Sequence, residues 1–324
     1  KSFVRWAVAQ GLTVFIVSWV NPDERQAHLD FEDYVEDGIL AALAAVEAAT
    51  GEKDIAAIGY CVGGTLLAMA LAYMAATDDK RISSATFFTT LVDFAEPGDL
   101  KYFTDEIRIR VAEQAMQEKG YLDGAAMAQA FNMLRPNELI WSYVVSNYLK
   151  GKEPPAFDLL VWNSDSTRMT RANHTWYLRN CYLENNFTRG ALKMLGCQLD
   201  LHKVTVPVYN LAAREDHIAP ARAVFRGAQF FGGPMRYVLA GSGHIAGVVN
   251  PADAPKYQYW TGCRPEGEFD DWVAKARETA GTWWGDWLAW LSAQSSAKVP
   301  ARTPGVGKLK AICDAPGGYV RVKA

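Results

Sequence analysis

Long apolar runs, an excess of one charge sign and paired cysteines are all missing from this sequence. No run approaches the roughly 20 apolar residues that a membrane-spanning helix needs, and no secretory signal precedes the first apolar segment. The formal net charge is only -3, which gives no reason to expect nucleic acid or an anionic membrane surface as the main partner. We therefore expect a soluble protein that acts on a small molecule or a neutral polymer.

Cysteines are few and do not form a recognisable pattern. The sequence has an odd number of them, widely spaced and without a C-x-x-C pair: Cys61, Cys181, Cys197, Cys263 and Cys313. This usage is typical of a reducing cytoplasm and argues against a disulfide framework or a zinc site. We expect no metal and no bound cofactor, and at least one thiol that is free for chemistry.

The composition is that of a folded protein. Half of the 324 residues are hydrophobic and 21% are charged, which is enough for a sizeable packed core. One large α/β domain with an insertion fits this length as well as two separate domains do. The first residue is Lys1 rather than Met, and residues 2–10 already show an apolar-faced helix that Gly11 ends, so we expect the chain to begin inside a domain.

Strand-like runs alternate with helical patterns in the first part of the chain. Residues 13–19 are a continuous β-branched and aromatic run that predicts a strand buried on both faces, and residues 54–60 and 84–90 predict two more. Helical spacing covers residues 30–50 and 65–76. This alternation predicts a mostly parallel sheet with right-handed crossovers.

The middle of the chain breaks this alternation. Residues 92–190 contain helical patterns, over 105–119 and 138–149, but no convincing buried strand. Strand periodicity returns at 206–212 and 235–239, with a helix over 219–230 between them. We therefore expect one catalytic domain over residues 1–324, with a core of 1–91 and 191–324 and a helical cap inserted at 92–190.

Gly59-Tyr60-Cys61-Val62-Gly63-Gly64 has the form of a nucleophile elbow, with cysteine at the position that is usually serine. The strained backbone of such a turn needs small neighbours, which we assign to Gly59 and Gly63. The helix that follows favours a thiolate at Cys61 and offers the Val62 N–H as an oxyanion donor. The alternative is a Gly-rich turn that only lets a helix pack closely on the sheet, with Cys61 as a small core residue.

Two downstream segments favour catalysis over that alternative. Asp216 follows one predicted strand, and His244 follows the next, so both are expected at the sheet edge that carries Cys61. The order nucleophile, acid, histidine is that of the α/β-hydrolase fold. Each segment also has a plainer interpretation as a surface turn. In the first segment, His217 could simply cap the helix that follows it. The coincidence of residue type, order and strand position predicts a Cys61-His244-Asp216 triad.

The chain resembles the catalytic domain of polyhydroxyalkanoate synthases, also called poly(3-hydroxybutyrate) polymerases. The resemblance covers nearly the whole chain, and its tail, A-P-G-G-Y-V-R-V-K-A, is similar to the ending of the class I enzymes. It rests on the segments G-Y-C-V-G-G-T at 59–65, T-T-L-V-D-F-A at 89–95, L-R-P-N-E-L-I-W-S-Y-V-V-S-N-Y-L-K-G at 134–151, F-D-L-L-V-W-N-S-D at 157–165, R-E-D-H-I-A-P at 214–220 and S-G-H-I-A-G-V-V-N-P at 242–251.

The resemblance implies an acyltransferase that polymerises (R)-3-hydroxyacyl-CoA, in particular short-chain 3-hydroxybutyryl-CoA, and releases coenzyme A. It makes Cys61 the acyl-carrying nucleophile, His244 its activator and Asp216 the acid, which acts on His244 or on the 3-hydroxyl. It also implies that Arg179 and His217 bind substrate. The partners are the CoA thioester, the growing polyester and a second copy in a homodimer, in the cytoplasm at polyester granules.

Several readings stay open at this level. The family has an N-terminal region and a second oxyanion donor upstream of the segment that this chain covers. The rivals are a thioesterase, an esterase or a polyhydroxyalkanoate depolymerase of the same fold, and a non-catalytic granule-associated protein. Two aromatic sets have alternative roles: those of the cap, including Phe157 and Trp162, cover the site or fill a core, and the tryptophans from Trp283 to Trp290 pack on the sheet or touch a granule.

Overall fold

The structure is a computed structural model that describes residues 2–134, 136–153, 165, 167–295, 297–318 and 320, with 138 and 139 described by their backbone alone. The chain divides into two compact units. The core unit comprises residues 1–17, 32–101 and 179–311, and the second unit comprises 18–31, 102–178 and 312–324. The expected cap at 92–190 stays a prediction.

A six-stranded sheet forms the centre of the core unit, in the order β1-β2-β7-β8-β9-β10. The first four strands pair in parallel, and β9 and β10 are antiparallel to their neighbours. The expected mostly parallel sheet is confirmed. The strands are β1 (Ile55–Tyr60), β2 (Ile82–Phe88), β7 (Val208–Ala213), β8 (Met235–Ala240), β9 (Gln258–Thr261) and β10 (Arg277–Ala280).

Residues 13–19 do not form the buried strand that their composition predicts. They belong to no strand, and Phe15 and Ile16 are 51% and 62% exposed. A strand needs a neighbour to take its backbone hydrogen bonds, and in the described chain β1 at the adjacent end of the sheet pairs with β2 alone. The predicted strand at residues 13–19 is therefore wrong, because β-branched and aromatic side chains alone do not make a strand without a paired neighbour.

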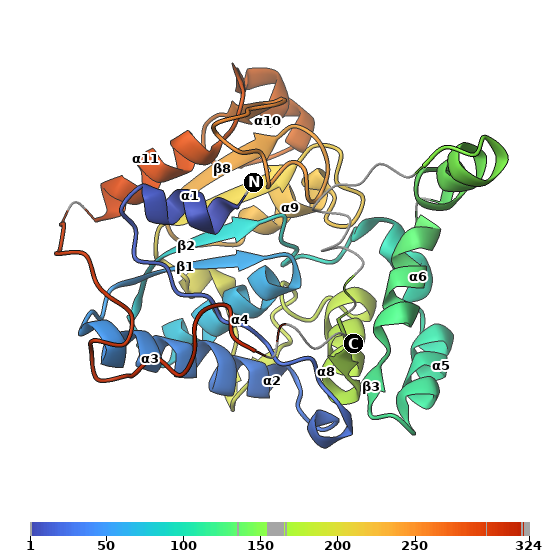
Figure 1. Ribbon diagram of the computed structural model, residues 1–324, viewed down its shortest axis with the longest axis horizontal. Helices are drawn as coiled ribbons and strands as arrows, with labels where there is room; N and C mark the ends of the chain where they lie inside the picture. The colour runs from blue at the N-terminus through green and yellow to red at the C-terminus, as the bar shows by residue number, and fades with distance from the viewer. Residues whose placement is uncertain are drawn as a thin grey trace. The chain divides into compact units, whose positions relative to one another are not determined.

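The helices of the core unit lie on both sides of the sheet (Figure 1), with α1 and α11 side by side on one side and α3 and α4 on the other. Helix α4 follows β1 directly, and ten of its fifteen residues are buried. These helices are α1 (Phe3–Ala9), α2 (Phe31–Asp33), α3 (Ala41–Thr50), α4 (Val62–Ala76), α9 (Ala221–Ala228), α10 (Phe269–Lys275) and α11 (Trp284–Gln294).

Shorter elements complete the core unit and join these helices. The π-helical turn η2 (Tyr34–Leu40) makes residues 31–50 one continuous helical stretch, as the spacing predicts, and Gly51 ends it with a φ of 77°. The others are η3 (Gly98–Phe103), which crosses into the second unit, η6 (Leu178–Leu183), which begins there, η7 (Leu201–Lys203), and the strand pair β5 (Lys193–Met194) and β6 (Cys197–Gln198).

An aromatic cluster fills the space between α11 and the sheet. Trp283, Trp284 and Trp287 are only 1% to 2% exposed. Phe3 of α1 contacts all three rings at centroid distances of 4.9 to 5.8 Å, and Phe88 at the end of β2 contacts Trp283 at 4.9 Å. The interpretation that the tryptophans pack against the sheet is confirmed for these three, which present no surface to a granule, and Trp290 packs partly buried against the same cluster.

The second unit is mostly helical, as the sequence predicts for this region. Helix α5 (Glu106–Met116) begins after Asp105, whose side chain accepts a hydrogen bond from the Arg108 N–H at 2.9 Å. Phe157 and Trp162 lie outside the described residues. The other elements are η1 (Glu24–Gln26), β3 (Tyr121–Leu122), α6 (Gly124–Leu134), η4 (Asn137–Trp141), η5 (Val144–Leu149), β4 (Met169–Thr170) and α8 (Arg171–Tyr177).

A buried carboxylate joins three segments of the core unit. Asp93, 3% exposed, lies just after β2 and forms an ion pair with Arg226 of α9. It also accepts hydrogen bonds from the Asn185 Nδ2 at 2.7 Å and the Thr188 hydroxyl at 2.9 Å. Because these donors satisfy the carboxylate, its burial is tolerated, and removing it takes away an acceptor that Arg226, Asn185 and Thr188 share.

We expect Asp93→Ala to lower the free energy of unfolding by about 3 kcal/mol, since it breaks a buried ion pair from one side. The matched control is Asp270→Ala, which removes the exposed partner of Arg222 and should cost about 0.5 kcal/mol. Urea unfolding followed by circular dichroism measures both. Equal losses in the two variants would show that the Asp93 network does not stabilise the core unit.

Candidate active site

Cys61 occupies the sharp turn between β1 and α4. Its φ of 52° and ψ of -125° lie in a region that a residue with a side chain rarely adopts. Hydrogen bonds to its backbone N–H and carbonyl stabilise this conformation. The Cys61 N–H donates to the Phe88 carbonyl at 3.0 Å, and the Cys61 carbonyl accepts from Gly64 and Thr65. The half-buried thiol therefore stands at the end of the sheet as a nucleophile elbow requires.

The small neighbours that this turn needs are Gly59 and Gly64. A Cβ on Gly59 would lie 2.5 Å from the Gly64 Cα, and a Cβ on Gly64 would lie 1.9 Å from the Thr90 hydroxyl oxygen. A Cβ on Gly63 would meet nothing within 4 Å. The prediction for Gly59 is confirmed, and the one for Gly63 is wrong because its missing side chain would point into open space.

His244 and Asp216 meet at the same edge of the sheet. The His244 Nδ1 lies 2.7 Å from the Asp216 Oδ2, and the two side chains are 10% and 0% exposed. The Cys61 side chain is near enough to the imidazole to raise its pKa. The three residues that the sequence places at three strand ends are thus brought together at one edge of the sheet.

The second carboxylate oxygen of Asp216 fixes the orientation of the acid. Its Oδ1 accepts hydrogen bonds from the N–H groups of Ile218 at 2.8 Å and Ala219 at 2.9 Å. The alternative in which His217 caps the next helix is not supported, since the residue preceding α9 is Pro220 and these amides bind Asp216. Asp216 therefore presents one oxygen to its own turn and the other to His244.

The pKa of His244 is raised from its ordinary value of 6.5 to about 10. Burial is the largest influence and lowers the pKa, but the hydrogen bonds to Asp216 and Cys61 and the negative charges of both groups together outweigh it. The site therefore favours the protonated form of the His244 imidazole. Such a group can deliver a proton to a leaving thiolate.

Tyr60, the residue before the nucleophile, is a site residue that the sequence reasoning missed. Its hydroxyl donates to the His244 carbonyl at 2.8 Å, and its ring lies on the imidazole with centroids 5.4 Å apart and 26° between the planes. Burial raises the pKa of Tyr60, with the charges of Cys61 and Asp216 adding to the effect, so the phenol stays a donor. The only sequence signal for this role of Tyr60 is that an aromatic residue precedes Cys61 in the elbow.

The remaining predicted site residues occupy defined places in the core unit. Val62 is the first residue of α4, so its N–H lies at the positive end of a helix and has no acceptor within it. His217 is half-buried directly after Asp216, and Arg179 lies in η6. The oxyanion role of Val62 and the substrate contacts of Arg179 and His217 stay predictions.

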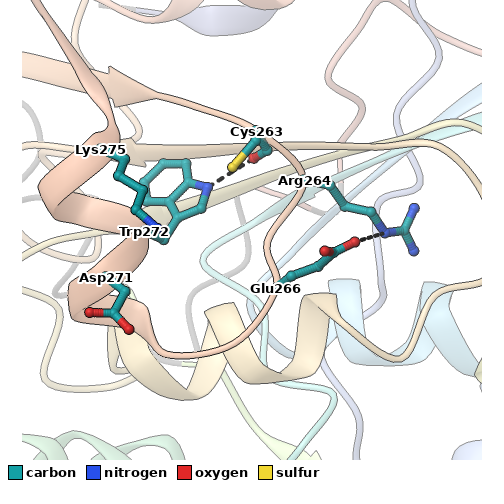
Figure 2. A pocket seen from close by; sticks show the side chains of 6 residues that line it. All are labelled: Cys263, Arg264, Glu266, Asp271, Trp272 and Lys275. Carbon is teal, nitrogen blue, oxygen red and sulfur yellow. Dashed lines mark hydrogen bonds and ion pairs between the residues drawn. The ribbon is translucent and has the colours of Figure 1, made fainter.

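A surface pocket of about 240 Å³ lies away from the triad, lined by Cys263, Arg264, Glu266, Asp271, Trp272 and Lys275 (Figure 2). Strand β9 runs antiparallel to β8, so the residues after Thr261 are at the sheet edge opposite to Cys61. Its lining mixes two cationic and two acidic side chains around the Trp272 indole, which donates to the Cys263 carbonyl at 2.8 Å. The pocket is therefore separate from Cys61, His244 and Asp216.

Within the part of the chain that the structure describes, no three His, Cys, Asp or Glu side chains are grouped so that they could bind a metal ion. Among the same residues, no helix has both the length and the apolar character needed to cross a membrane.

Comparison with known proteins defines the class. A family model described as the alpha/beta hydrolase fold matches residues 6–251. Together with the parallel sheet and the strained elbow, this match shows that the chain belongs to the α/β-hydrolase family.

Within this class, the chain is similar to poly(3-hydroxyalkanoate) polymerases over its whole length. It is 59% identical to "Poly(3-hydroxyalkanoate) polymerase" of Methylorubrum extorquens over 325 residues, which cover 100% of this chain and 54% of that protein. It is 58% identical over 324 residues to the polymerase subunit PhaC of Rhizobium meliloti (strain 1021), with 100% of this chain and 53% of that protein covered. The chain thus spans about half the length of these relatives.

Solved structures show a more distant likeness. A hydrolase from Pseudomonas aeruginosa PA01 matches with a TM-score of 0.42 and 17% identity, covering 68% of this chain and 66% of that one. At these values, nothing about the chemistry of the site follows from the likeness.

The elbow predicts a graded response to single methyl groups. Gly59→Ala and Gly64→Ala should each destabilise the protein by about 2 kcal/mol or more, because the added Cβ meets backbone or a buried threonine. Gly63→Ala, the matched control, should change stability by about 0.5 kcal/mol at most, since its Cβ enters open space. Thermal unfolding measures all three, and a loss for Gly63→Ala as large as for Gly64→Ala would contradict this geometry.

The raised pKa of His244 predicts how stability depends on pH. Below about 6.5 both the folded and unfolded states bind the proton, and between 6.5 and about 10 only the folded state keeps it. The stabilisation is therefore fully present below pH 6.5 and is lost as pH rises through 10, by on the order of a few kcal/mol.

Urea unfolding of the protein and of His244→Gln at pH 6, 8 and 10 isolates this contribution. The difference in unfolding free energy between the two proteins should shrink as pH rises. Parallel pH profiles would mean that His244 is not protonated in the folded state over this range.

Proposed function

We propose that this chain is the catalytic domain of a polyhydroxyalkanoate synthase that joins (R)-3-hydroxyacyl units from coenzyme A thioesters into a polyester. The proposal is supported by the meeting of Cys61 with the hydrogen-bonded His244–Asp216 pair, in a chain 59% identical to a polymerase. A cysteine suits this reaction because a thiolate exchanges with a thioester at little thermodynamic cost.

In the first step, the Cys61 sulfur attacks the thioester carbonyl of the substrate. The negative charge moves to the carbonyl oxygen, where the Val62 N–H at the start of α4 lies at the positive helix end and serves as a donor. When the tetrahedral intermediate collapses, the bond to the sulfur of coenzyme A breaks. That sulfur takes the proton of the His244 imidazolium, and the acyl group is left on Cys61 as a thioester.

In the second step, neutral His244 acts as a base toward the 3-hydroxyl group of another hydroxyacyl unit. The hydroxyl oxygen attacks the Cys61 thioester, an ester bond forms, the C–S bond breaks and the Cys61 thiolate is restored beside a protonated His244. Asp216, 2.7 Å from His244, stabilises the imidazolium at both stages. The family resemblance also implies a second role, in which Asp216 acts on the 3-hydroxyl itself.

Polymerisation requires that the hydroxyl of the next unit reaches the acyl-cysteine more readily than water does. We assign this exclusion to the helical cap at residues 92–190, whose aromatic side chains are the apolar cover that the sequence offers. Arg179 and His217 are the residues proposed to contact the substrate. Short-chain (R)-3-hydroxybutyryl-CoA is the proposed monomer.

The setting that goes with this activity is also proposed. The resemblance supports a homodimer in the cytoplasm at the surface of polyester granules, with the CoA thioester and the growing chain as its ligands and no metal or cofactor in the reaction. The polymerase relatives are the finding consistent with it.

One assay separates this function from its rivals. The protein is mixed with (R)-3-hydroxybutyryl-CoA, and free thiol and polymer are followed together. Thiol release with polymer supports the synthase, and thiol release with only the monomeric acid identifies a thioesterase. No thiol release favours a non-catalytic granule-associated protein, and cleavage of added polyester favours a depolymerase.

Cys61→Ala should abolish thiol release and polymer formation, a loss of at least about a thousandfold, because no other group takes the acyl unit. Cys197→Ala is the matched control: this cysteine is also half-buried in the core unit but lies in β6, and activity should be retained. Polymer formed by Cys61→Ala at the unaltered rate would remove Cys61 from the mechanism.

A further inference from the structure

The loop that carries His244 is held from behind by two neighbouring tryptophans. The indole N–H of Trp283 donates to the Gly247 carbonyl at 2.9 Å, and that of Trp284 donates to the Val248 carbonyl at 3.0 Å. Gly247 and Val248 are buried, so their carbonyls have no access to water and need a protein donor. The start of α11 therefore supplies two donors to consecutive residues of the histidine loop.

Backbone hydrogen bonds carry this restraint to both neighbours of His244. The Gly247 N–H donates to the Gly243 carbonyl at 2.8 Å, and the Val248 N–H donates to the Ile245 carbonyl at 3.1 Å. The two residues that accept hydrogen bonds from the indoles thus donate their own N–H groups to the two residues on either side of His244. A shift at Gly247 or Val248 would move the imidazole relative to Cys61.

Close packing leaves the loop little room for another path. A Cβ on Gly247 would lie 2.8 Å from the Gly243 carbonyl oxygen and 2.9 Å from the Ala213 Cβ at the end of β7. Ser242, two residues before the histidine, has a φ of 74°, which a side-chain-bearing residue adopts only under constraint. The loop therefore has a strained backbone before His244, at Ser242, and is closely packed after it, at Gly247.

The two tryptophans are themselves fixed by helix α1. Phe3 contacts Trp283 at 5.8 Å and Trp284 at 5.2 Å between ring centroids, and Trp6 contacts Trp284 at 5.1 Å. Figure 1 shows α1 lying beside α11 on the same side of the sheet. Buried rings in contact on several sides have few rotamers, so their N–H groups are pre-oriented.

We propose that Trp283 and Trp284 are positioning residues that set the distance of His244 from Cys61 through hydrogen bonds to the Gly247 and Val248 carbonyls. They touch no reacting atom and act through the histidine loop. The proposal rests on the proposed function only in that Cys61 is the nucleophile, because its effect is expected on the reactivity of that thiol whatever the substrate.

Trp287 provides a matched control on the same helix. It is as buried as the other two, and its indole N–H also makes a hydrogen bond, at 3.0 Å, but to the Thr86 hydroxyl inside β2. Changing it to phenylalanine removes the same ring volume and the same kind of donor without touching the histidine loop. A loss that comes only from weaker core packing should therefore appear equally in all three variants.

The experiment compares Trp283→Phe, Trp284→Phe and Trp287→Phe by the alkylation of Cys61 with iodoacetamide between pH 6 and 9. Mass spectrometry of the Cys61 peptide gives its rate, with exposed Cys263 as an internal reference in every sample. Unfolding free energies of the same variants measure the packing loss. This readout needs no acyl substrate, so it is independent of whether polymer forms.

We expect Trp283→Phe and Trp284→Phe each to slow the alkylation of Cys61 near neutral pH by about five- to tenfold, the effect of one lost hydrogen bond, and to change the pH profile of its rate. Trp287→Phe should leave the profile unchanged at a similar loss of stability. An equal slowing by Trp287→Phe, or unchanged profiles for Trp283→Phe and Trp284→Phe, would overturn the proposal.

If a phenylalanine variant does not fold, benzothienylalanine at the same position keeps the bicyclic shape and lacks only the N–H, and the same comparison applies. Loss of thiol release and polymer in the unmodified protein, with the alkylation pattern as expected, would refute the proposed function and leave the positioning role intact. The reverse result would refute the positioning role alone.

Discussion

The hydrogen bond between His244 and Asp216 is the interaction on which the site depends. It joins two loops that follow neighbouring parallel strands, and it lies in a buried setting where an unpaired carboxylate or imidazolium would be costly. Each side of the pair has further restraints: turn amides hold Asp216, and Tyr60 and the histidine loop hold His244. The charge of the imidazolium is thereby kept within reach of Cys61.

The geometry around Cys61 shows how the fold stores strain at one residue. The turn exists because β1 ends against β2 and α4 begins at once, and only glycine at positions 59 and 64 lets strand, helix and Thr90 approach so closely. The strained cysteine is held by backbone hydrogen bonds on both sides, so its thiol has little freedom of position. Preorganisation of this kind is what a nucleophile in acyl transfer requires.

The meeting of Cys61, Asp216 and His244 at one sheet edge could be predicted from the sequence, because residue type, chain order and position after a strand are all local features. Cys61, Asp216 and His244 each follow a strand that the pattern predicts, and parallel strands bring their ends together. The four-residue strands β9 and β10 were missed, since such short segments carry too little periodicity to be recognised.

The errors and omissions have physical causes as well. Residues 13–19 have strong β-propensity, but a strand forms only beside a partner. The choice between Gly63 and Gly64 depended on where a Cβ would point, which needs coordinates. The roles of Tyr60 and of Trp283 are hydrogen bonds to backbone carbonyls far away in the chain, and no spacing in the sequence reveals them.

In the proposed mechanism, Cys61 carries the acyl group while His244 and Asp216 serve the transfer. To test this, the protein is mixed with (R)-3-hydroxybutyryl-CoA, the mixture is quenched in acid within seconds, and any covalent adduct is located by peptide mass spectrometry. We expect a 3-hydroxyacyl thioester, monomeric or oligomeric, on Cys61 and none on the other four cysteines. Turnover of the substrate with Cys61 unmodified, or an adduct on another residue, would contradict it.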